Sequence, residues 1–154
     1  MDNNRIEKVT LLNAPLERVW AAISDSAQFG TWFGAEFDGP FVEGRSTTGR
    51  IVPTSVDAEV AAAQEPHRGA PLALQVVAVE PMTRFVFQWK GSLESDVATT
   101  VTFRLDPVGA GVRLSITESG FEGLPEQLRA ATRDGNAAGW EAQLGLVASY
   151  LEHA

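Results

Sequence analysis

The chain has 154 residues, a length that suits one domain, and 44% of them are hydrophobic, which is enough for a real core. Its 12 basic and 20 acidic side chains give a net charge of −8, which argues against nonspecific nucleic-acid binding and against adhesion to anionic membranes. The absence of cysteine excludes disulfides, thiolate nucleophiles and zinc–thiolate sites. We find no signal-peptide pattern and no apolar run near the roughly 20 residues of a membrane span, so we expect one cytoplasmic domain over residues 1–154.

The first part of the chain predicts one strand and two short helices. Residues 5–12, RIEKVTLL, alternate between apolar and polar side chains as a strand does. Pro15 suits the first turn of a helix, and apolar residues recur at helical spacing from Leu16 to Ile23. Residues 25–34, DSAQFGTWFG, predict a second short helix that displays three aromatic side chains.

The middle of the chain has a period of two, which predicts strands. Residues 37–52 read as two short strands around a glycine-rich turn, and residues 53–71, with three prolines, read as a long loop. Two hairpins follow. The first pairs residues 72–80 with 83–89, and the second spans residues 98–119 with its turn at DPVGAG.

The last part of the chain is helical. We expect one helix over residues 125–134 and a longer one over 137–152, either separate or joined with a kink. Gly139 marks the expected kink or a close backbone approach, whereas Gly145 has no evident role. The longer helix has one apolar stripe, formed by Trp140, Leu144, Val147 and Leu151. Strands followed by a helix that packs on them indicate a two-layer α+β fold with an antiparallel sheet.

A straight helix on a strongly curved sheet leaves a gap, which large side chains fill or which remains as a cavity. The chain has eight phenylalanines and four tryptophans, several of them beside turns and helix ends. Aromatic rings both fill such gaps and line apolar ligand pockets. Two alternatives therefore stay open from the sequence, a packed core and a ligand site.

Four segments together resemble a known family. They are NAPLERVWAAISDSAQFGTWFGA, VVAVEPMTRFVFQW, TTVTFRLDPVGAGVRLSITESGF and GWEAQLGLVASYL. Over residues 5–152 the chain resembles the bacterial branch of the activator of heat-shock-protein-ninety ATPase homologue family, within the START-like (SRPBCC, Bet v-like) superfamily. Residues 53–71 depart most from the family pattern, because the segment is longer than expected there.

The resemblance implies a helix-grip fold, in which a seven-stranded antiparallel sheet curls around a long C-terminal helix and two short helices follow the first strand. It also implies a cavity between sheet and helix, open towards the short helices and the strand loops. Superfamily members bind lipids, sterols, polyketides or other hydrophobic molecules there, some members are aromatases or cyclases, and the eukaryotic namesake is a co-chaperone.

We therefore expect a module that binds a small hydrophobic or amphipathic molecule, as a monomer or homodimer, with no cofactor or metal. The alternatives are a co-chaperone-like partner of a heat-shock ATPase and a cyclase or aromatase. The residues expected in the cavity and its mouth are Phe29, Trp32, Phe33, Phe37, Phe41, Phe87, Trp89, Phe103, Glu118, Phe121, Trp140 and Leu144. Phe29, Trp32 and Phe33 either form a gate over the cavity or belong to a small separate core, and the sequence does not decide between these roles. Trp89 and Trp140 are expected in the core or in the cavity wall.

Three carboxylates are candidates for acid–base chemistry near the cavity: Glu36, Asp38 and Glu118. Glu118 shares the strand parity of inward-facing apolar residues, and a buried carboxylate would have a raised pKa. The alternative is a strand-end carboxylate that reaches water or pairs with Arg84 or Arg104, and we favour it.

The two histidines have no evident partners. His67 lies in the long loop and is either an acid or base at the cavity mouth or, as we favour, a solvated side chain. His153 is next to the C-terminus and is expected in solvent. Neither a Ser-His-Asp set nor a pair of histidines at metal-ligand spacing is present, so we nominate no catalytic residue.

Overall fold

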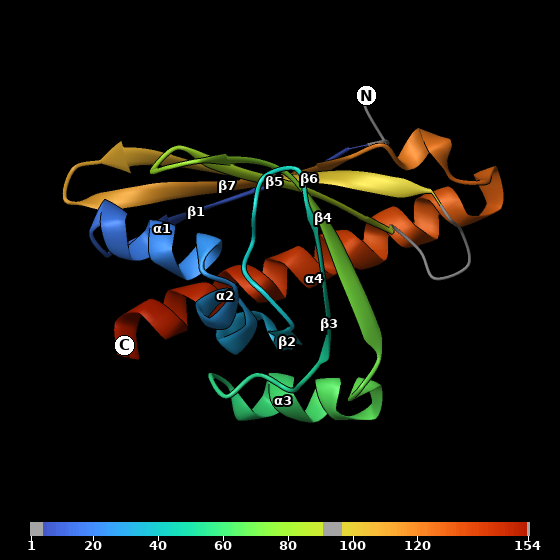
Figure 1. Ribbon diagram of the computed structural model, residues 1–154, viewed down its shortest axis with the longest axis horizontal. Coiled ribbons are helices and arrows are strands. Elements are labelled where there is room, and N and C mark those ends of the chain that lie inside the picture. Colours follow the sequence, from blue (N-terminus) through green and yellow to red (C-terminus); the bar gives the residue numbers. More distant parts are fainter. Residues whose placement is uncertain (1–4, 91–96, 154) are drawn as a thin grey trace.

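The computed structural model describes residues 5–90 and 97–153, and within them seven strands form one curved antiparallel sheet with helices packed on its inner side (Figure 1). The strand order is β1-β7-β6-β5-β4-β3-β2, and each neighbouring pair is antiparallel. The strands are β1 (Arg5–Leu12), β2 (Ala35–Phe37), β3 (Ser46–Ile51), β4 (Pro71–Glu80), β5 (Arg84–Lys90), β6 (Ala98–Val108) and β7 (Gly111–Ser119).

Two short helices follow the first strand and a long helix ends the chain, as in the predicted helix-grip fold. The helical segments are α1 (Leu16–Ser24), α2 (Ser26–Phe33), α3 (Ala58–Gln64), the 3-10 turns η1 (Glu65–His67) and η2 (Phe121–Gly123), and α4 (Glu126–His153). The prediction of an α+β helix-grip fold with an antiparallel sheet is therefore confirmed. None of the helices in residues 5–90 and 97–153 is both long and apolar enough to cross a membrane.

The first of the two strands predicted over residues 37–52 begins and ends earlier than expected. β2 ends at Phe37, and residues 38–45 form a loop before β3. This loop contains Pro40, which has no N–H for a strand ladder, so the sheet pairing cannot continue through it.

The prediction of a loop without regular structure over residues 53–71 is wrong, because the segment contains α3 and η1. Helix α3 buries no residue, so it lacks the apolar stripe that would identify it in the sequence. The Asp57 carboxylate caps its first turn by accepting a backbone N–H at 3.0 Å. At its other end Gln64 donates to the Phe33 carbonyl at 3.0 Å and accepts from the Thr54 N–H at 2.8 Å. Local capping and two long-range hydrogen bonds therefore stabilise α3.

Helix α4 runs without interruption from Glu126 to His153, so the break considered between its two predicted parts is absent. Within the described residues the close backbone approach considered at Gly139 is also absent, because none of their heavy atoms outside the helix backbone lies within 4 Å of the position that a Cβ would take there. Gly135 and Gly145 have the same open surroundings. The glycines of α4 therefore leave space beside the helix.

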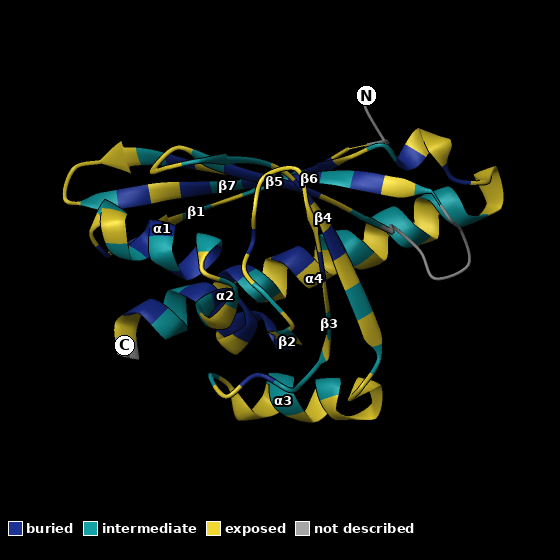
Figure 2. Ribbon diagram, in the orientation of Figure 1, coloured by how far each residue is buried: buried dark blue, intermediate teal, exposed yellow. Residues whose placement is uncertain are grey.

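Helix α4 crosses the inner side of the sheet and is held by polar contacts along its length (Figure 1). Near its start Arg133 donates to the Arg5 carbonyl of β1 at 3.2 Å, and near its end the Tyr150 hydroxyl donates to Gln28 of α2 at 3.0 Å. Buried residues lie on the inner side of the sheet and on the facing sides of α1, α2 and α4 (Figure 2). The predicted apolar stripe of α4 is buried, and so are alternate residues of β6 and β7: Val101, Phe103, Leu105, Val112, Leu114 and Ile116.

Candidate functional site

A small pocket lies where the end of α2, the end of β5 and the middle of α4 meet. Its volume is about 120 Å³ and it is partly open to solvent. We call it the tryptophan pocket, and its lining residues are Phe33, Trp89, Gly135, Asn136, Gly139, Trp140 and Gln143. Typical drug-sized ligand pockets have about 300–1,000 Å³, while a cavity of about 150 Å³ holds benzene, so this pocket suits a small molecule or one end of a larger one.

Two glycines create the space on the α4 side of the tryptophan pocket. Gly135 and Gly139 are four residues apart and therefore lie on the same side of the helix, next to Trp140 and Gln143. Space beside both glycines is open. Any larger side chain at either position would project towards the pocket and reduce its volume. The backbone at the two glycines therefore forms part of the pocket wall. Gly145 also has open surroundings but does not line the pocket.

A buried carboxylate lies behind the aromatic wall of the tryptophan pocket. Glu118 of β7 has no exposed surface, which confirms that its strand parity points inward. Its Oε1 accepts from Trp140 Nε1 at 2.9 Å, and its Oε2 accepts from Trp89 Nε1 at 2.9 Å and from Thr99 Oγ1 at 2.5 Å. Asn136 Nδ2 donates to both oxygens at 3.2 Å. The carboxylate therefore orients groups from β5, β6 and α4 at once.

The expected pairing of Glu118 with an arginine or water is wrong. Arg84 pairs with Glu80 at 2.8 Å, and Arg104 pairs with Asp106 at 3.5 Å. Among the side chains that the structure describes, every hydrogen-bond donor to Glu118 is neutral. Four neutral side chains therefore satisfy the oxygens of this buried carboxyl group.

The two indoles of the pocket form a stacked pair. The rings of Trp89 and Trp140 have centroids 5.4 Å apart and planes inclined by 26°. The ring centroid of Phe33 lies 6.1 Å from that of Trp89 and 6.2 Å from that of Trp140. Since both indole N–H groups donate to Glu118, the ring orientations are set by the carboxylate as well as by packing.

Gln143 closes the pocket next to Phe33. Its Nε2 donates to the Phe33 carbonyl at 3.2 Å. Its Oε1 is buried and has no hydrogen-bond partner among the residues that the structure describes. A buried acceptor without a partner costs free energy, so this oxygen marks a place where a ligand donor would be favourable.

The other aromatic residues predicted for the cavity lie elsewhere. Phe29 and Trp32 are core residues beneath α2, so the gate alternative applies only to Phe33. Phe37 is half-buried and lines a separate groove of about 380 Å³ between α2, β2 and residues 52–55. The predicted residues that are buried in the core and do not line the tryptophan pocket are Phe29, Trp32, Phe41, Phe87, Phe103, Phe121 and Leu144.

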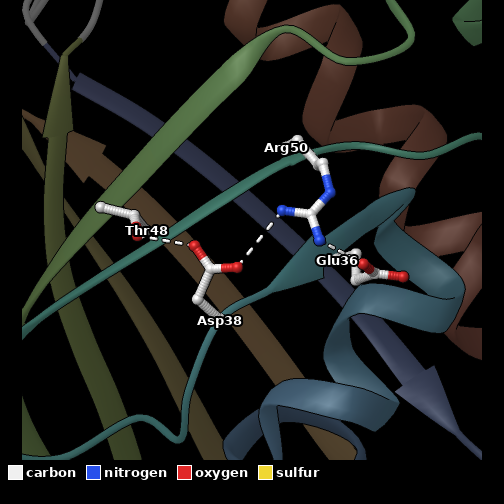
Figure 3. A network of polar contacts seen from close by, with 4 residues as sticks. All are labelled: Glu36, Asp38, Thr48 and Arg50. Atoms are coloured by element: carbon white, nitrogen blue, oxygen red, sulfur yellow. Dashed lines mark hydrogen bonds and ion pairs between the residues drawn. The ribbon is translucent and has the colours of Figure 1, made fainter.

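The other two candidate carboxylates, Glu36 of β2 and Asp38 just after it, belong to an exposed network with β3 (Figure 3). Arg50 pairs with Glu36 and, at 3.2 Å, with Asp38, and the Thr48 hydroxyl donates to Asp38 at 2.8 Å. The pKa of Asp38 is lowered by the Thr48 hydrogen bond first and by the Arg50 hydrogen bond second. Glu36 and Asp38 are therefore held on the surface, away from the tryptophan pocket.

His67 does not line the tryptophan pocket. His67 is exposed in η1, in agreement with the expectation that its side chain is solvated. The side chain of His153 lies outside the part that the structure describes. Within residues 5–90 and 97–153, no group of three or more His, Asp or Glu side chains could hold a metal ion.

Sequence reasoning missed four lining residues, all on α4: Gly135, Asn136, Gly139 and Gln143. A usable signal was present. Gly135 and Gly139 are four residues apart, and Asn136, Trp140 and Gln143 lie near them at helical spacing. This side of the helix therefore has small and polar residues, whereas a helix side that faces a core has large apolar side chains.

Comparisons with known proteins agree with this architecture. A family model described as activator of Hsp90 ATPase homolog 1-like protein matches residues 13–152. The chain belongs to this family. The matched residues include the parts of α2, β5 and α4 that line the tryptophan pocket of this chain. No curated protein matches the chain.

Solved structures of bacterial proteins share the fold. Protein MLL2253 from Mesorhizobium loti is 23% identical, with 97% of this chain and 98% of that chain covered and a TM-score of 0.73. The Aha1 dimer from Colwellia psychrerythraea is 17% identical, with 96% of each chain covered and a TM-score of 0.71. DynU16, from the dynemicin biosynthetic locus, is 24% identical with a TM-score of 0.70; 97% of this chain is covered, but it spans only 47% of DynU16.

Proposed function

We propose that the protein binds a small molecule and that the tryptophan pocket is its binding site. The observation that carries the proposal is the buried Glu118, which holds the two pocket indoles in place beside helix positions that have no side chains. A ligand site needs side chains whose orientation is set before the ligand arrives, and this arrangement supplies it.

Features of the pocket lower stability, which supports a role in binding. A glycine inside a helix costs about 1 kcal/mol relative to alanine, and α4 has two of them at the pocket. Burying a carboxylate without a cation also costs free energy. Residues that lower stability locally are typical of functional sites, and here the glycines and the buried carboxylate all lie at the tryptophan pocket.

The size of the pocket limits the ligand. The interior beneath α2 is filled by aromatic rings, so a lipid or sterol lying along the whole helix would have no space there. We infer a molecule near the size of a single ring, or a larger one that inserts one end. DynU16 is described by its place in a biosynthetic locus, which supports a small-molecule role.

Nuclear magnetic resonance of the four indole N–H groups tests the proposal. Benzyl alcohol as a probe should shift the Trp89 and Trp140 signals in proportion to its concentration, while Trp20 and Trp32, which do not line the pocket, serve as internal controls. Gly139→Leu should abolish these shifts by filling the pocket, and the matched variant Gly145→Leu should leave them unchanged. Shifts that survive Gly139→Leu, or no shift from a panel of neutral and charged fragments of this size, would contradict the proposal.

The other partners and activities stay predictions. The homologue from Colwellia psychrerythraea is described as a dimer, and the edge strand β1 of this chain exposes Val9 and Leu11, so a homodimer is one expected state. A chaperone ATPase as a partner stays a prediction. For a cyclase or aromatase, the nominated Glu36 and His67 lie apart from the tryptophan pocket, and Glu118 already accepts hydrogen bonds on both oxygens.

A further inference from the structure

The hydrogen-bonding groups of the tryptophan pocket are unequally engaged. The nitrogens of Trp89, Trp140 and Asn136 donate to Glu118, and the nitrogen of Gln143 donates to the Phe33 carbonyl. Each side-chain nitrogen of the lining is therefore bonded to another protein group. By contrast, the buried Oε1 of Gln143 is an acceptor that has no partner in residues 5–90 and 97–153. The pocket offers a ligand an acceptor in preference to a donor.

The charges around the tryptophan pocket have one sign. Its described lining includes no lysine, arginine or histidine. Glu118, behind the indoles, forms no ion pair with any residue whose side chain the structure describes. An anion without a nearby cation in a buried site produces a negative potential that solvent screens poorly.

The apolar lining of the pocket favours the same sign of ligand. Phe33, Trp89 and Trp140 present aromatic rings, whose faces carry negative electrostatic potential and attract cations. Tryptophan is the strongest of the aromatic side chains in this respect. The Gln143 acceptor, the Glu118 carboxylate and the faces of the aromatic rings thus all favour a ligand group that is positively charged over a neutral group of the same shape.

We propose that the tryptophan pocket selects a small organic ammonium ion. This inference rests on the proposed binding function and names the class of ligand. A substituted ammonium group combines the required features: an apolar surface to contact the rings, a positive charge near Glu118, and a size compatible with about 120 Å³. Any longer substituent would extend through the open side of the pocket.

A pair of probes that differ only in charge tests the inference. Choline and 3,3-dimethyl-1-butanol have nearly the same shape, because the second replaces the quaternary nitrogen by carbon. Titrations followed by the Trp89 and Trp140 indole N–H signals should show choline binding about tenfold more tightly, the preference expected from one or two cation–π contacts and a nearby anion.

Two variants separate the sources of the preference. Glu118→Gln removes the charge and should reduce the ratio of the two affinities several-fold, whereas Glu122→Gln removes an exposed carboxylate on η2 and should leave the ratio unchanged. Phe33→Leu keeps the carboxylate and an apolar side chain but removes one aromatic ring. It should weaken choline binding more than binding of the neutral probe, so the inference remains testable if Glu118→Gln fails to fold.

The outcomes distinguish this inference from the proposed function. Equal affinities for choline and the neutral probe, or tighter binding of the neutral probe, would overturn the cation preference and leave the binding function in place. Binding of benzyl alcohol without binding of choline would do the same. Failure of every probe to move the Trp89 and Trp140 signals would overturn both.

Discussion

The space between the sheet and the helices has a filled end and a hollow end, and both are built from aromatic side chains. Beneath α2, the ring of Phe29 lies within 6.5 Å, centroid to centroid, of seven other aromatic rings. At the middle of α4, Phe33, Trp89 and Trp140 leave about 120 Å³ between them and the helix. The difference lies in the helix: α2 contributes Phe29 and Trp32 to the space, whereas α4 contributes two glycines.

The two ends also satisfy buried indoles differently. In the filled end, Trp32 donates to the backbone carbonyl of Ala22 at 2.8 Å. In the hollow end, Trp89 and Trp140 donate to a carboxylate. A backbone carbonyl satisfies an indole without adding charge, whereas the carboxylate brings an anion into the interior. The hollow end therefore has features beyond what packing requires, and the following variants test this contrast.

The largest expected effect is loss of stability at the filled end. Phe29→Ala should lower the free energy of unfolding by about 3–5 kcal/mol, because it leaves a cavity surrounded by rings that cannot collapse into it. Phe33→Ala should cost less, since that ring already borders open space and water can enter. Urea unfolding of both variants gives the comparison. Equal losses would show that the pocket side is packed as tightly as the interior.

A smaller effect of opposite sign is expected from the glycines of α4. Gly139→Ala and Gly145→Ala should each raise the free energy of unfolding by about 0.5–1 kcal/mol, because both sites are open and alanine favours the helix. Only Gly139→Ala should weaken benzyl alcohol binding, because Gly145 does not line the pocket. Thermal unfolding and the indole titration separate the two effects. Unchanged binding in Gly139→Ala would place the ligand elsewhere.

Most of the fold could be predicted because its signals are local. Alternation identified β4 to β7, and helical spacing identified α1, α2 and the apolar stripe of α4. Helix α3 escaped because it is seven residues long and buries none of them. Its stability depends on the Asp57 cap and on Gln64, whose partners, Phe33 and Thr54, come from other parts of the chain.

The site was predicted only in part. Strand parity identified Glu118 as inward, but its partners come from β5, β6 and α4 and could not be read from spacing. Most of the aromatic residues lie buried between sheet and helices, yet composition cannot tell which of them leave space. That depends on the volumes opposite each ring, and here Gly135 and Gly139 decide it.

The smallest expected effect concerns the exposed carboxylates, which contrast with Glu118. Thr48→Val removes the hydroxyl that contributes most to the lowered pKa of Asp38, so that pKa should rise towards its ordinary value of 3.8. Because the folded-state pKa is lowered, the network stabilises the fold above the ordinary pKa of aspartate, and this contribution is lost as the pH falls through the folded-state pKa.

Carbon-detected NMR titration of the Asp38 carboxyl group measures this change directly. Ser46→Ala is the matched control, since its hydroxyl lies on the same strand but donates to Gln75 at 2.5 Å. Overall stability near neutral pH should change little in either variant, because the side chains are exposed. If the pKa of Asp38 stayed low in Thr48→Val, the ion pair with Arg50 would be its main cause, and the ordering of the two hydrogen bonds given above would be wrong.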